Sequence, residues 1–298
     1  GAIGYIDGYN NSKRNVTFNN WSIEKVNVSK WVDNDGSAGG LVGWNIGYGS
    51  VVITGENKSE TCSENVTNLS VATYSERVQY YDEEEKKNKD KPIQAAAGGL
   101  VGACDFSSVN ISNVNAKNLI ITGERVRDIG GLIAGKRNGT GKAVSVENCV
   151  LHAANVNAPS DSTECRTGGI IGYHDGQLTI KSVTLDQDST INGQQYTGGF
   201  VGESNAAVSI TDCSEKNVSV KSNTRNWVGG FIGHLGIYKN ATFTNCQQEN
   251  VTVLGRYVGG LVGAADGNMQ ASNIEFQNVI IATTKVKKES RNTGLLTG

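Results

Sequence analysis

The chain of 298 residues is short of proline, methionine and histidine, with two, one and three copies respectively, and it has no long apolar run. Because a membrane-spanning helix needs about 20 consecutive apolar residues, we expect no membrane span. The formal net charge of -2 gives no electrostatic reason to expect nucleic acid as a partner. Glycine is abundant, with 38 copies, and with Asn, Ser and Thr it favours short strands joined by tight turns.

The common catalytic and metal-binding motifs are also missing. The three histidines, His152, His174 and His234, form no His-Glu-x-x-His motif, and no two cysteines have Cys-x-x-Cys spacing. A glycine-rich stretch ending at Lys136 is similar to a phosphate-binding loop, but Arg137 stands where that loop requires Ser or Thr. We therefore predict no catalytic residue, no metal and no cofactor.

One short phrase recurs along the whole chain and reads Val-Gly-Gly-Leu-Val-Gly at 258–263. The second glycine of each copy falls at positions 1, 40, 99, 131, 169, 199, 230, 260 and 294, so the spacings are 39, 59, 32, 38, 30, 31, 30 and 34. A unit of about 30 residues is typical of a repeat architecture, in which each unit buries its apolar face against its neighbours. We interpret 1–298 as a single repeat domain and as a segment of a longer array.

The clearest unit, at 207–233, contains short alternating stretches at 208–210, 217–220 and 227–232, separated by Asn, Asp and Gly. Three strands per unit are typical of one coil of a parallel β-helix. The predicted fold is therefore all-β, a right-handed parallel β-helix (β-solenoid) of about eight coils, each of about 30 residues and three strands.

Aligning the units places small or apolar residues in one interior column, which consists of Trp21, Cys62, Val114, Cys149, Val183, Cys213, Cys246 and Ile274. The residue before most of them is Asn or Asp, at Asn20, Asn113, Asn148, Asp212, Asn245 and Asn273. Stacked amides at a bend can hydrogen-bond to the coils above and below, which would fix the register.

The glycine pair leaves open which of the apolar residues that follow it are buried. Strict strand alternation would bury Val258 and Val262 but would expose Leu261 and its equivalents as an apolar stripe. Either the glycine pair forms a bulge that buries both faces, which we favour, or the stripe packs against a partner.

Extra residues enter just before the glycine pair, at 31–38, 74–97 and 152–167, and should project from one edge of the solenoid. The segment 74–97 carries a run of charges, and we interpret it as a solvated charged loop or short helix. The same turn contains Tyr196, Trp227 and Tyr257 on successive coils. These rings are candidate glycan contacts, and the alternative is that they stack on one another.

Two sets of residues are candidates for covalent modification. The six cysteines allow 15 disulfide connectivities, and the candidates are Cys62, Cys104, Cys149, Cys165, Cys213 and Cys246. Twelve Asn-x-Ser/Thr sequons are candidate N-glycosylation sites, at Asn10, Asn15, Asn20, Asn27, Asn57, Asn65, Asn68, Asn110, Asn138, Asn217, Asn240 and Asn250. Asn followed by β-branched and hydroxyl residues is also what such strands and turns are built from.

The repeat phrase, followed by Ile-Thr-Asp-Cys or Phe-Thr-Asn-Cys and then by Asn-Val-Ser/Thr-Val, resembles the GLUG repeat over nearly the whole chain. The Gly-Gly-Leu-Val phrase with Phe18-Asn19-Asn20 is also similar, less closely, to the repeats of polymorphic outer-membrane autotransporters. The GLUG resemblance implies a large secreted or surface protein, such as an adhesin or the non-catalytic part of an IgA-specific metallopeptidase.

We therefore expect a non-catalytic structural or adhesive domain at the cell surface or outside the cell, a stalk or filament subunit that stacks end to end with other copies or further repeats. The alternative is a glycan-binding module that uses the aromatic residues. A polysaccharide lyase or hydrolase is the third candidate, because Asp128 and Arg166 share a column on adjacent coils, but we expect no second carboxylate beside them.

Overall fold

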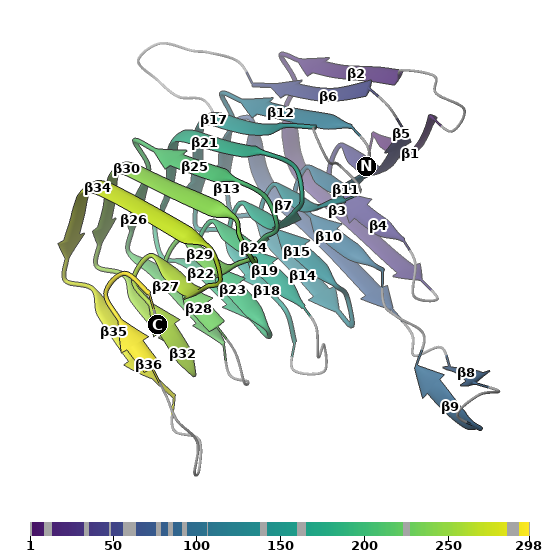
Figure 1. The fold of residues 1–298 in the computed structure, drawn as a ribbon. Helices are drawn as coiled ribbons and strands as arrows, with labels where there is room; N and C mark the ends of the chain where they lie inside the picture. The colour runs from purple at the N-terminus through teal and green to yellow at the C-terminus, as the bar shows by residue number, and fades with distance from the viewer. Residues whose placement is uncertain are drawn as a thin grey trace.

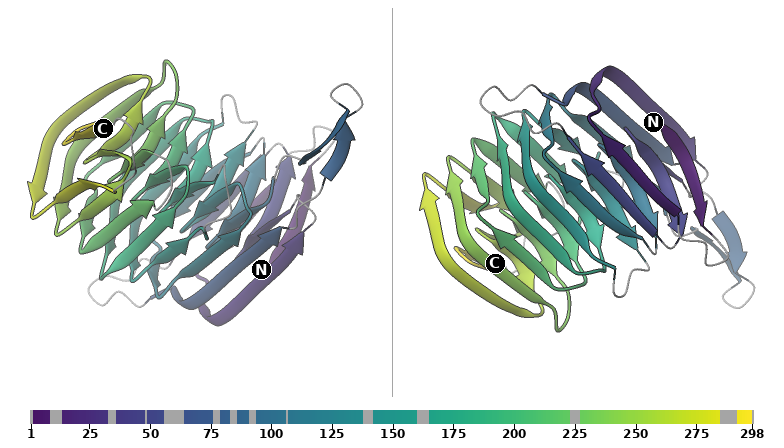
Figure 2. Two further views of the ribbon diagram at one scale, coloured as in Figure 1. Left: turned by 90° about the horizontal axis from the view of Figure 1, so that it is seen from below. Right: turned by 90° about the horizontal axis from the view of Figure 1, so that it is seen from above.

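The computed structural model describes residues 2–8, 14–32, 36–47, 49–55, 64–75, 79–82, 86–90, 94–105, 107–137, 142–159, 165–222, 227–284 and 292–297. The described residues form strands and no helix, and the strands stack into a parallel β-helix whose first and last coils lie at opposite ends (Figure 1, Figure 2). Two of its sheets have eight strands each, which confirms the predicted fold and the predicted eight coils.

Sheets 1 and 3, as we name them, consist of short strands on either side of the glycine pair. Sheet 1 contains β1 (Ile3–Gly8), β5 (Val42–Gly47), β11 (Val101–Asp105), β16 (Ile133–Arg137), β20 (Ile171–His174), β24 (Val201–Ser204), β29 (Ile232–Leu235) and β33 (Val262–Ala265). Sheet 3 contains β4 (Ser37–Gly39), β10 (Ala96–Gly98), β15 (Asp128–Gly130), β19 (Arg166–Gly168), β23 (Tyr196–Gly198), β28 (Trp227–Gly229), β32 (Tyr257–Gly259) and β36 (Asn292–Gly294).

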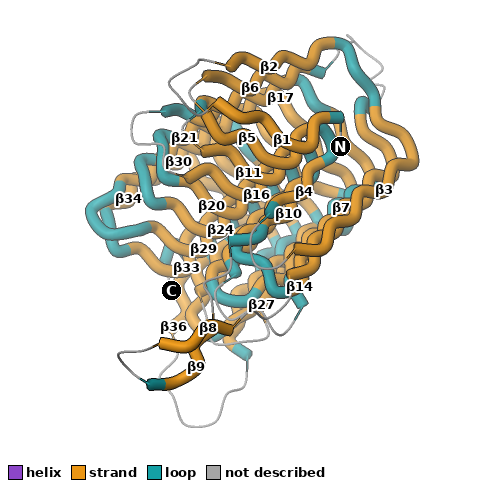
Figure 3. The backbone as a smooth tube through the Cα atoms, turned by 90° about the vertical axis from the view of Figure 1, so that its right-hand side faces the viewer, coloured by secondary structure: helices purple, strands orange, loops and turns teal. Residues whose placement is uncertain are grey.

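Sheet 2 is the widest sheet and is bent along each coil (Figure 3). Its first part contains β2 (Arg14–Asn19), β6 (Gly49–Thr54), β12 (Ser108–Ser112), β13 (Asn115–Lys117), β17 (Val144–His152), β21 (Leu178–Asp186), β25 (Val208–Thr211), β26 (Ser214–Lys216), β30 (Asn240–Glu249) and β34 (Asn268–Gln277). Its second part contains β3 (Ile23–Val32), β7 (Val66–Ser75), β14 (Ile120–Glu124), β18 (Asn155–Asn157), β22 (Ser189–Gly193), β27 (Val218–Ser222), β31 (Thr252–Gly255) and β35 (Ile280–Thr283).

The bends of sheet 2 lie at residues in the left-handed backbone region, where Asn and Asp are tolerated better than other non-glycine residues. Every residue of the predicted Asn/Asp column has a positive φ, between 51° and 55°. The side chains also bond between coils, since Asn245 Nδ2 donates to Asp212 Oδ1 and Asn273 Nδ2 donates to Asn245 Oδ1, each at 2.9 Å. The predicted ladder is confirmed, and the backbone conformation explains why Asn recurs there.

The glycine pair is a corner between sheet 3 and sheet 1, which is a correction to the single strand predicted over 227–232. In that coil β28 ends at Gly229 and β29 begins at Ile232. The corner turns the predicted stripe into the core, where each member is at most 5 % exposed; the members are Leu41, Leu100, Leu132, Ile170, Phe200, Phe231 and Leu261. The glycines are needed for close approach between coils, because a Cβ on Gly131 would overlap the carbonyl oxygen of Gly169.

The insertion at 74–97 contains an antiparallel hairpin of β8 (Gln79–Asp82) and β9 (Lys87–Asp90), which projects from the body of the solenoid (Figure 1). The prediction of a charged loop or short helix was therefore wrong for these residues. Pleated backbone pairing satisfies the main-chain polar groups of a projecting segment, which a loop would leave to water.

The core is a set of interior columns of Val, Ile, Leu, Phe and Cys running along the axis. The predicted column from Val114 to Ile274 is confirmed by the strand register, whereas Cys62 lies outside the described residues. One column departs from apolar character, because in-register pairing continues Leu151 and Leu185 with the fully buried Glu215 and Gln248.

Candidate functional site

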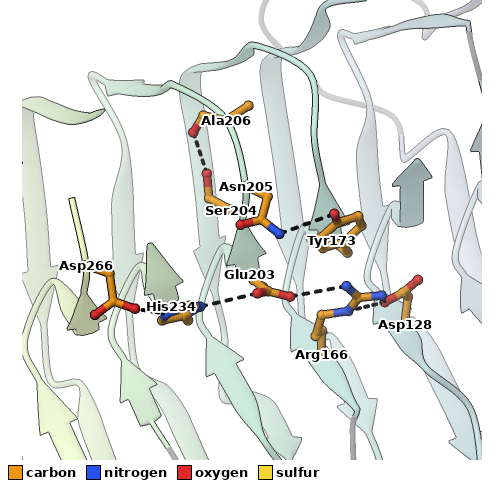
Figure 4. A network of polar contacts seen from close by, with 9 residues as sticks. All are labelled: Asp128, Arg166, Tyr173, Glu203, Ser204, Asn205, Ala206, His234 and Asp266. Atoms are coloured by element: carbon orange, nitrogen blue, oxygen red, sulfur yellow. Dashed lines mark hydrogen bonds and ion pairs between the residues drawn. The ribbon is translucent and has the colours of Figure 1, made fainter. Parts of the chain in front are cut away.

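The candidate site lies where the outward faces of sheet 3 and sheet 1 meet at the glycine corner. The column of sheet 3 that precedes each glycine pair contains Asp128, Arg166, Tyr196, Trp227 and Tyr257. The facing column of sheet 1 contains Tyr173, Glu203 and His234. Because the corner returns the chain sharply, side chains of these two columns reach one another between neighbouring coils (Figure 4).

Arg166 is the centre of a buried charge network. Its Nε donates to Asp128 Oδ1 at 2.6 Å, and its Nη1 donates to Glu203 Oε2 at 3.1 Å. Its guanidinium carbon lies 3.7 Å from the centre of the Tyr173 ring, a cation–π arrangement. The expectation that no second carboxylate joins Asp128 and Arg166 was therefore wrong, because Glu203 reaches Arg166 from the other sheet.

His234 continues the network toward the C-terminal coils. Its Nδ1 lies 3.3 Å from Glu203 Oε1, and its Nε2 lies 3.0 Å from Asp266 Oδ2. Its ring stacks on Tyr196 with a centroid distance of 4.6 Å and an interplanar angle of 16°. The five charged groups thus form a line, Asp128, Arg166, Glu203, His234 and Asp266, which we call the charge ladder (Figure 4).

The contacts of Arg166, Glu203 and His234 favour the charged form of each of these three groups. Burial alone would raise the pKa of the Glu203 carboxyl, but the hydrogen bond from His234 and the charge of Arg166 outweigh burial and lower that pKa. Burial would lower the pKa of His234, but its bonds to Glu203 and Asp266 raise it. The pKa of Arg166 is raised by its two carboxylates against the opposing effect of burial. Arg166, Glu203 and His234 therefore each hold their charge more firmly than the same group does in water.

The candidate glycan contacts stack on one another. The centroids of Tyr196 and Trp227 are 5.3 Å apart with an interplanar angle of 23°, and those of Trp227 and Tyr257 are 5.8 Å apart with an angle of 22°. The guanidinium of Arg256 lies 5.0 Å from the centre of the Tyr257 ring. A sugar ring needs an aromatic face, and in this stack the faces between the rings are already occupied.

The cysteines are buried thiols rather than disulfide partners in the structure. Of the candidates, Cys149, Cys165, Cys213 and Cys246 are buried with free thiols, Cys104 is also buried, and Cys62 lies outside the described residues. Burial raises the pKa of Cys149, of Cys165 and of Cys213 to about 12. Such thiols are unreactive, which agrees with their place as small side chains in the core.

The sequons fall into three groups. Asn10, Asn57 and Asn138 lie outside the described residues, and Asn65 is buried, where its Oδ1 accepts a hydrogen bond from the backbone of Asn115. The exposed sequon asparagines are Asn15, Asn20, Asn27, Asn68, Asn110, Asn217, Asn240 and Asn250. Several of these also bond between coils, as when Asn250 Nδ2 donates to Asn217 Oδ1 at 3.0 Å.

Sequence reasoning missed Glu203 and His234, although a signal for both exists. Each lies four positions after the second glycine of its repeat, as does Tyr173, so alignment on the glycine pair places all three in one column. Sequence alignment does not show how sharply the chain turns at the glycine corner, and it is this turn that brings the column against Arg166 and Tyr196.

The described residues include no group of three or more His, Cys, Asp or Glu that could hold a metal. Among them there is also no helix long and apolar enough to cross a membrane.

Comparisons with known proteins add a fold likeness only. No protein-family model and no curated protein matches this sequence. A crystal structure from Bacteroides ovatus, provisionally described as an immunoglobulin A1 protease, is similar over 97 % of this chain and 85 % of that one. The two share 14 % sequence identity with a TM-score of 0.45.

Proposed function

We propose that the chain is a non-catalytic structural domain of a surface or secreted protein, in which the β-helix acts as a rigid stalk or filament unit. The observation that carries this proposal is that the charged groups best placed for chemistry are committed to one another. Arg166 bonds to both Asp128 and Glu203, and His234 bonds to both Glu203 and Asp266. This line of bonds crosses successive coils and ties the glycine corner of each coil to the next.

The pKa shifts of Glu203 and Arg166 argue against acid–base catalysis by these two groups. A glycoside hydrolase needs one carboxyl group with a raised pKa as the acid, and a general base needs a pKa near the working pH. The pKa of Glu203 is lowered and that of Arg166 is raised, so neither group is suited to exchange a proton. Glu215 has a carboxyl pKa raised to about 8, but it is fully buried in the core and out of reach of any substrate.

Location outside the cell is supported by the GLUG resemblance and by the number of exposed sequon asparagines. Glycan binding through Tyr196, Trp227 and Tyr257 remains the alternative proposal. Their mutual stacking favours protection of the solenoid edge, since a bound sugar would have to use ring edges or the end of the stack.

The proposal is tested by measuring stability and activity on the same variants. Arg166→Gln should lower the free energy of unfolding by about 3–5 kcal/mol, because it leaves the buried Asp128 and Glu203 without their cation. Glu203→Gln should lower it as well, but by less, because Arg166 keeps Asp128 and His234 keeps Asp266. The unchanged protein should turn over no polysaccharide or peptide in a broad substrate panel and should bind no glycan on an array. Lys221→Gln, on the partly exposed side of β27, serves as the matched control and should change neither property. Turnover that Glu203→Gln abolishes without loss of stability would contradict the structural role.

A further inference from the structure

One edge of the solenoid is formed by the turns that lead from sheet 1 into sheet 2, and we propose that two copies of this chain associate through this edge about a two-fold axis. The surface lies on three successive coils in the body of the solenoid, at the turns that follow β20, β24 and β29. The inference rests on the proposed structural function, because it specifies the partner surface of a structural unit.

The turn after β29 is longer than its neighbours. Counted between the columns that pair in register, it has five residues, whereas the turns after β20, β24 and β33 have three each; the ranges are 236–240, 175–177, 205–207 and 266–268. The extra residues raise Ile237 and Tyr238 above the shorter turns, and these two side chains are 62 % and 90 % exposed. We call Ile237 and Tyr238 the ridge. A projecting Tyr is one of the residues that most often anchor a protein interface.

The backbone holds the ridge in a fixed and unfavourable conformation. Tyr238 lies in the left-handed region with φ 59°, which is costly for a bulky side chain. Main-chain bonds fix the turn, since Tyr238 N donates to Asp266 O at 3.3 Å and Gly236 N donates to Ser204 O at 2.9 Å. A ridge that is already fixed loses little conformational freedom on binding. Strain kept at an exposed aromatic residue points to a contact outside its own chain.

Beside the ridge, the shorter turns after β20 and β24 leave a groove of about 390 Å³. Gly176, Ala206 and Ala207 line it with small side chains or none. The turn after β24 is held in place because Ser204 Oγ donates to Ala206 O at 2.8 Å (Figure 4). The groove therefore has room for a large side chain and allows another backbone to come close.

A two-fold axis through the turn after β24, perpendicular to the solenoid, seats the ridge of each copy in the groove of the other. Such an axis reverses the order of the coils, so the turn after β29 of one copy faces the turn after β20 of the other, and the turn after β24 faces itself. Ala206 and Ala207 then lie at the axis, where their small side chains permit a close approach. An axis parallel to the solenoid would instead set ridge against ridge.

The charges along the edge agree with the perpendicular axis. Lys239 belongs to the turn after β29 and Asp175 to the turn after β20, and both line the groove. The two turns are separated by two coil spacings, about 10 Å along the solenoid. Reversal of the coil order places Lys239 of each copy opposite the partner's Asp175, so two ion pairs form at once. With a parallel axis Lys239 would face Lys239, and the two like charges would repel.

The first test is sedimentation velocity of the 298-residue protein over a wide concentration range, at low and high salt. The unchanged protein should form dimers, because a contact that pairs the same edge of two copies closes at two. Lys239→Glu should weaken dimerisation at least about tenfold at low salt, because it opposes Asp175 with a like charge. Combining Lys239→Glu with Asp175→Lys should restore dimerisation. Lys221→Glu, the same change of charge on the partly exposed side of β27, should leave it unchanged.

Two further variants separate the contact from the fold. Tyr238→Gly should weaken dimerisation at least about tenfold, yet its melting temperature should stay the same or rise, because glycine adopts the left-handed conformation easily. Ala207→Cys lies at the proposed axis, so its thiol should meet that of the other copy. With oxidised glutathione as the oxidant, the two thiols should form one disulfide between the chains and release two molecules of reduced glutathione. Asn155→Cys, exposed on β18, is the control and should not cross-link.

A protein that stays monomeric at its solubility limit would overturn the proposal. Dimers that respond equally to Lys239→Glu and Lys221→Glu, or cross-linking of Asn155→Cys as readily as of Ala207→Cys, would overturn it too. None of these results involves turnover of a substrate, so the structural function would stand. Conversely, turnover of a polysaccharide or peptide would remove the proposed function while leaving the sedimentation result as observed.

Discussion

The buried Glu215 should make this protein less stable as pH rises through the neutral range. Its carboxyl is fully buried in a column that continues Leu185, and Gln248 Nε2 donates to its Oε2 at 2.6 Å. Burial raises the pKa of Glu215 from 4.5 to about 8, and the hydrogen bond from Gln248 opposes this only in part. The folded protein therefore keeps a proton that the unfolded chain releases.

The size and sign of the effect follow from linkage. Between pH 4.5 and about pH 8 the folded state binds one more proton than the unfolded state, so stability falls with rising pH. At 1.36 kcal/mol for each pH unit, and with partial titration near pH 5 and pH 8, the loss between these two values amounts to about 3–4 kcal/mol. Below pH 4.5 both states hold the proton, and the contribution no longer changes.

Urea unfolding at pH 5 and pH 8 measures this loss when Glu215→Gln is compared with the unchanged protein. The variant keeps the shape of the side chain and cannot ionise, so its loss of stability between the two pH values should be smaller by about 3–4 kcal/mol. Glu275→Gln, an exposed carboxylate in the last coil, should behave as the unchanged protein. Equal pH dependence in Glu215→Gln and the unchanged protein would refute the reasoning.

Three further predictions concern the corner, the charge ladder and the Asn ladder. Gly131→Ala should lower the free energy of unfolding by about 3 kcal/mol or prevent folding, since its Cβ overlaps the backbone of the next coil. In the same thermal melts, the control Gly4→Ala should leave the melting temperature unchanged, because its Cβ would have nothing within 4 Å. In a proton NMR titration, His234 should show a pKa above 6.5, and this pKa should fall in Glu203→Gln. The stability that its bonds contribute should be present below pH 6.5 and should fade as the pH rises through the raised pKa. A pKa of His234 that the substitution leaves unchanged would count against the charge ladder. Asn245→Ala should lower the free energy of unfolding, measured in urea, by about 2 kcal/mol. Asn245→Gly should lower it by less, because glycine adopts the left-handed backbone conformation of this position more easily than alanine. Equal losses in the two variants would mean that the backbone conformation is unimportant.

The interior columns were predictable because the repeat is nearly regular. Once the glycine pairs are aligned, the Asn column at the bends and the Cys213 and Cys246 positions beside it follow from counting. Glu215 was not predictable in this way, since its own repeat offers no reason for a carboxyl in a column that Leu151 and Leu185 fill. Only the register places it inside, opposite Gln248.

The candidate site was predictable in part. Asp128 and Arg166 fall into one column when the repeats are aligned, and the same is true of Tyr196, Trp227 and Tyr257. The link from Arg166 to Glu203 depends on the angle between two sheets, for which the sequence contains no direct signal.

The sequence by itself determined the period, the parallel coils and the residues that line each column, because stacking repeats of similar length leaves few other ways to bury their apolar positions. The tertiary structure decided what happens at the glycine corner. There the absence of a Cβ lets backbone approach backbone, so that Leu261 turns inward and the outer faces of two sheets meet. Because the two sheets meet there, Arg166 contacts Glu203 and His234 contacts Tyr196. No sequence motif predicts these contacts, since they depend on distances in space between columns that a linear pattern does not contain.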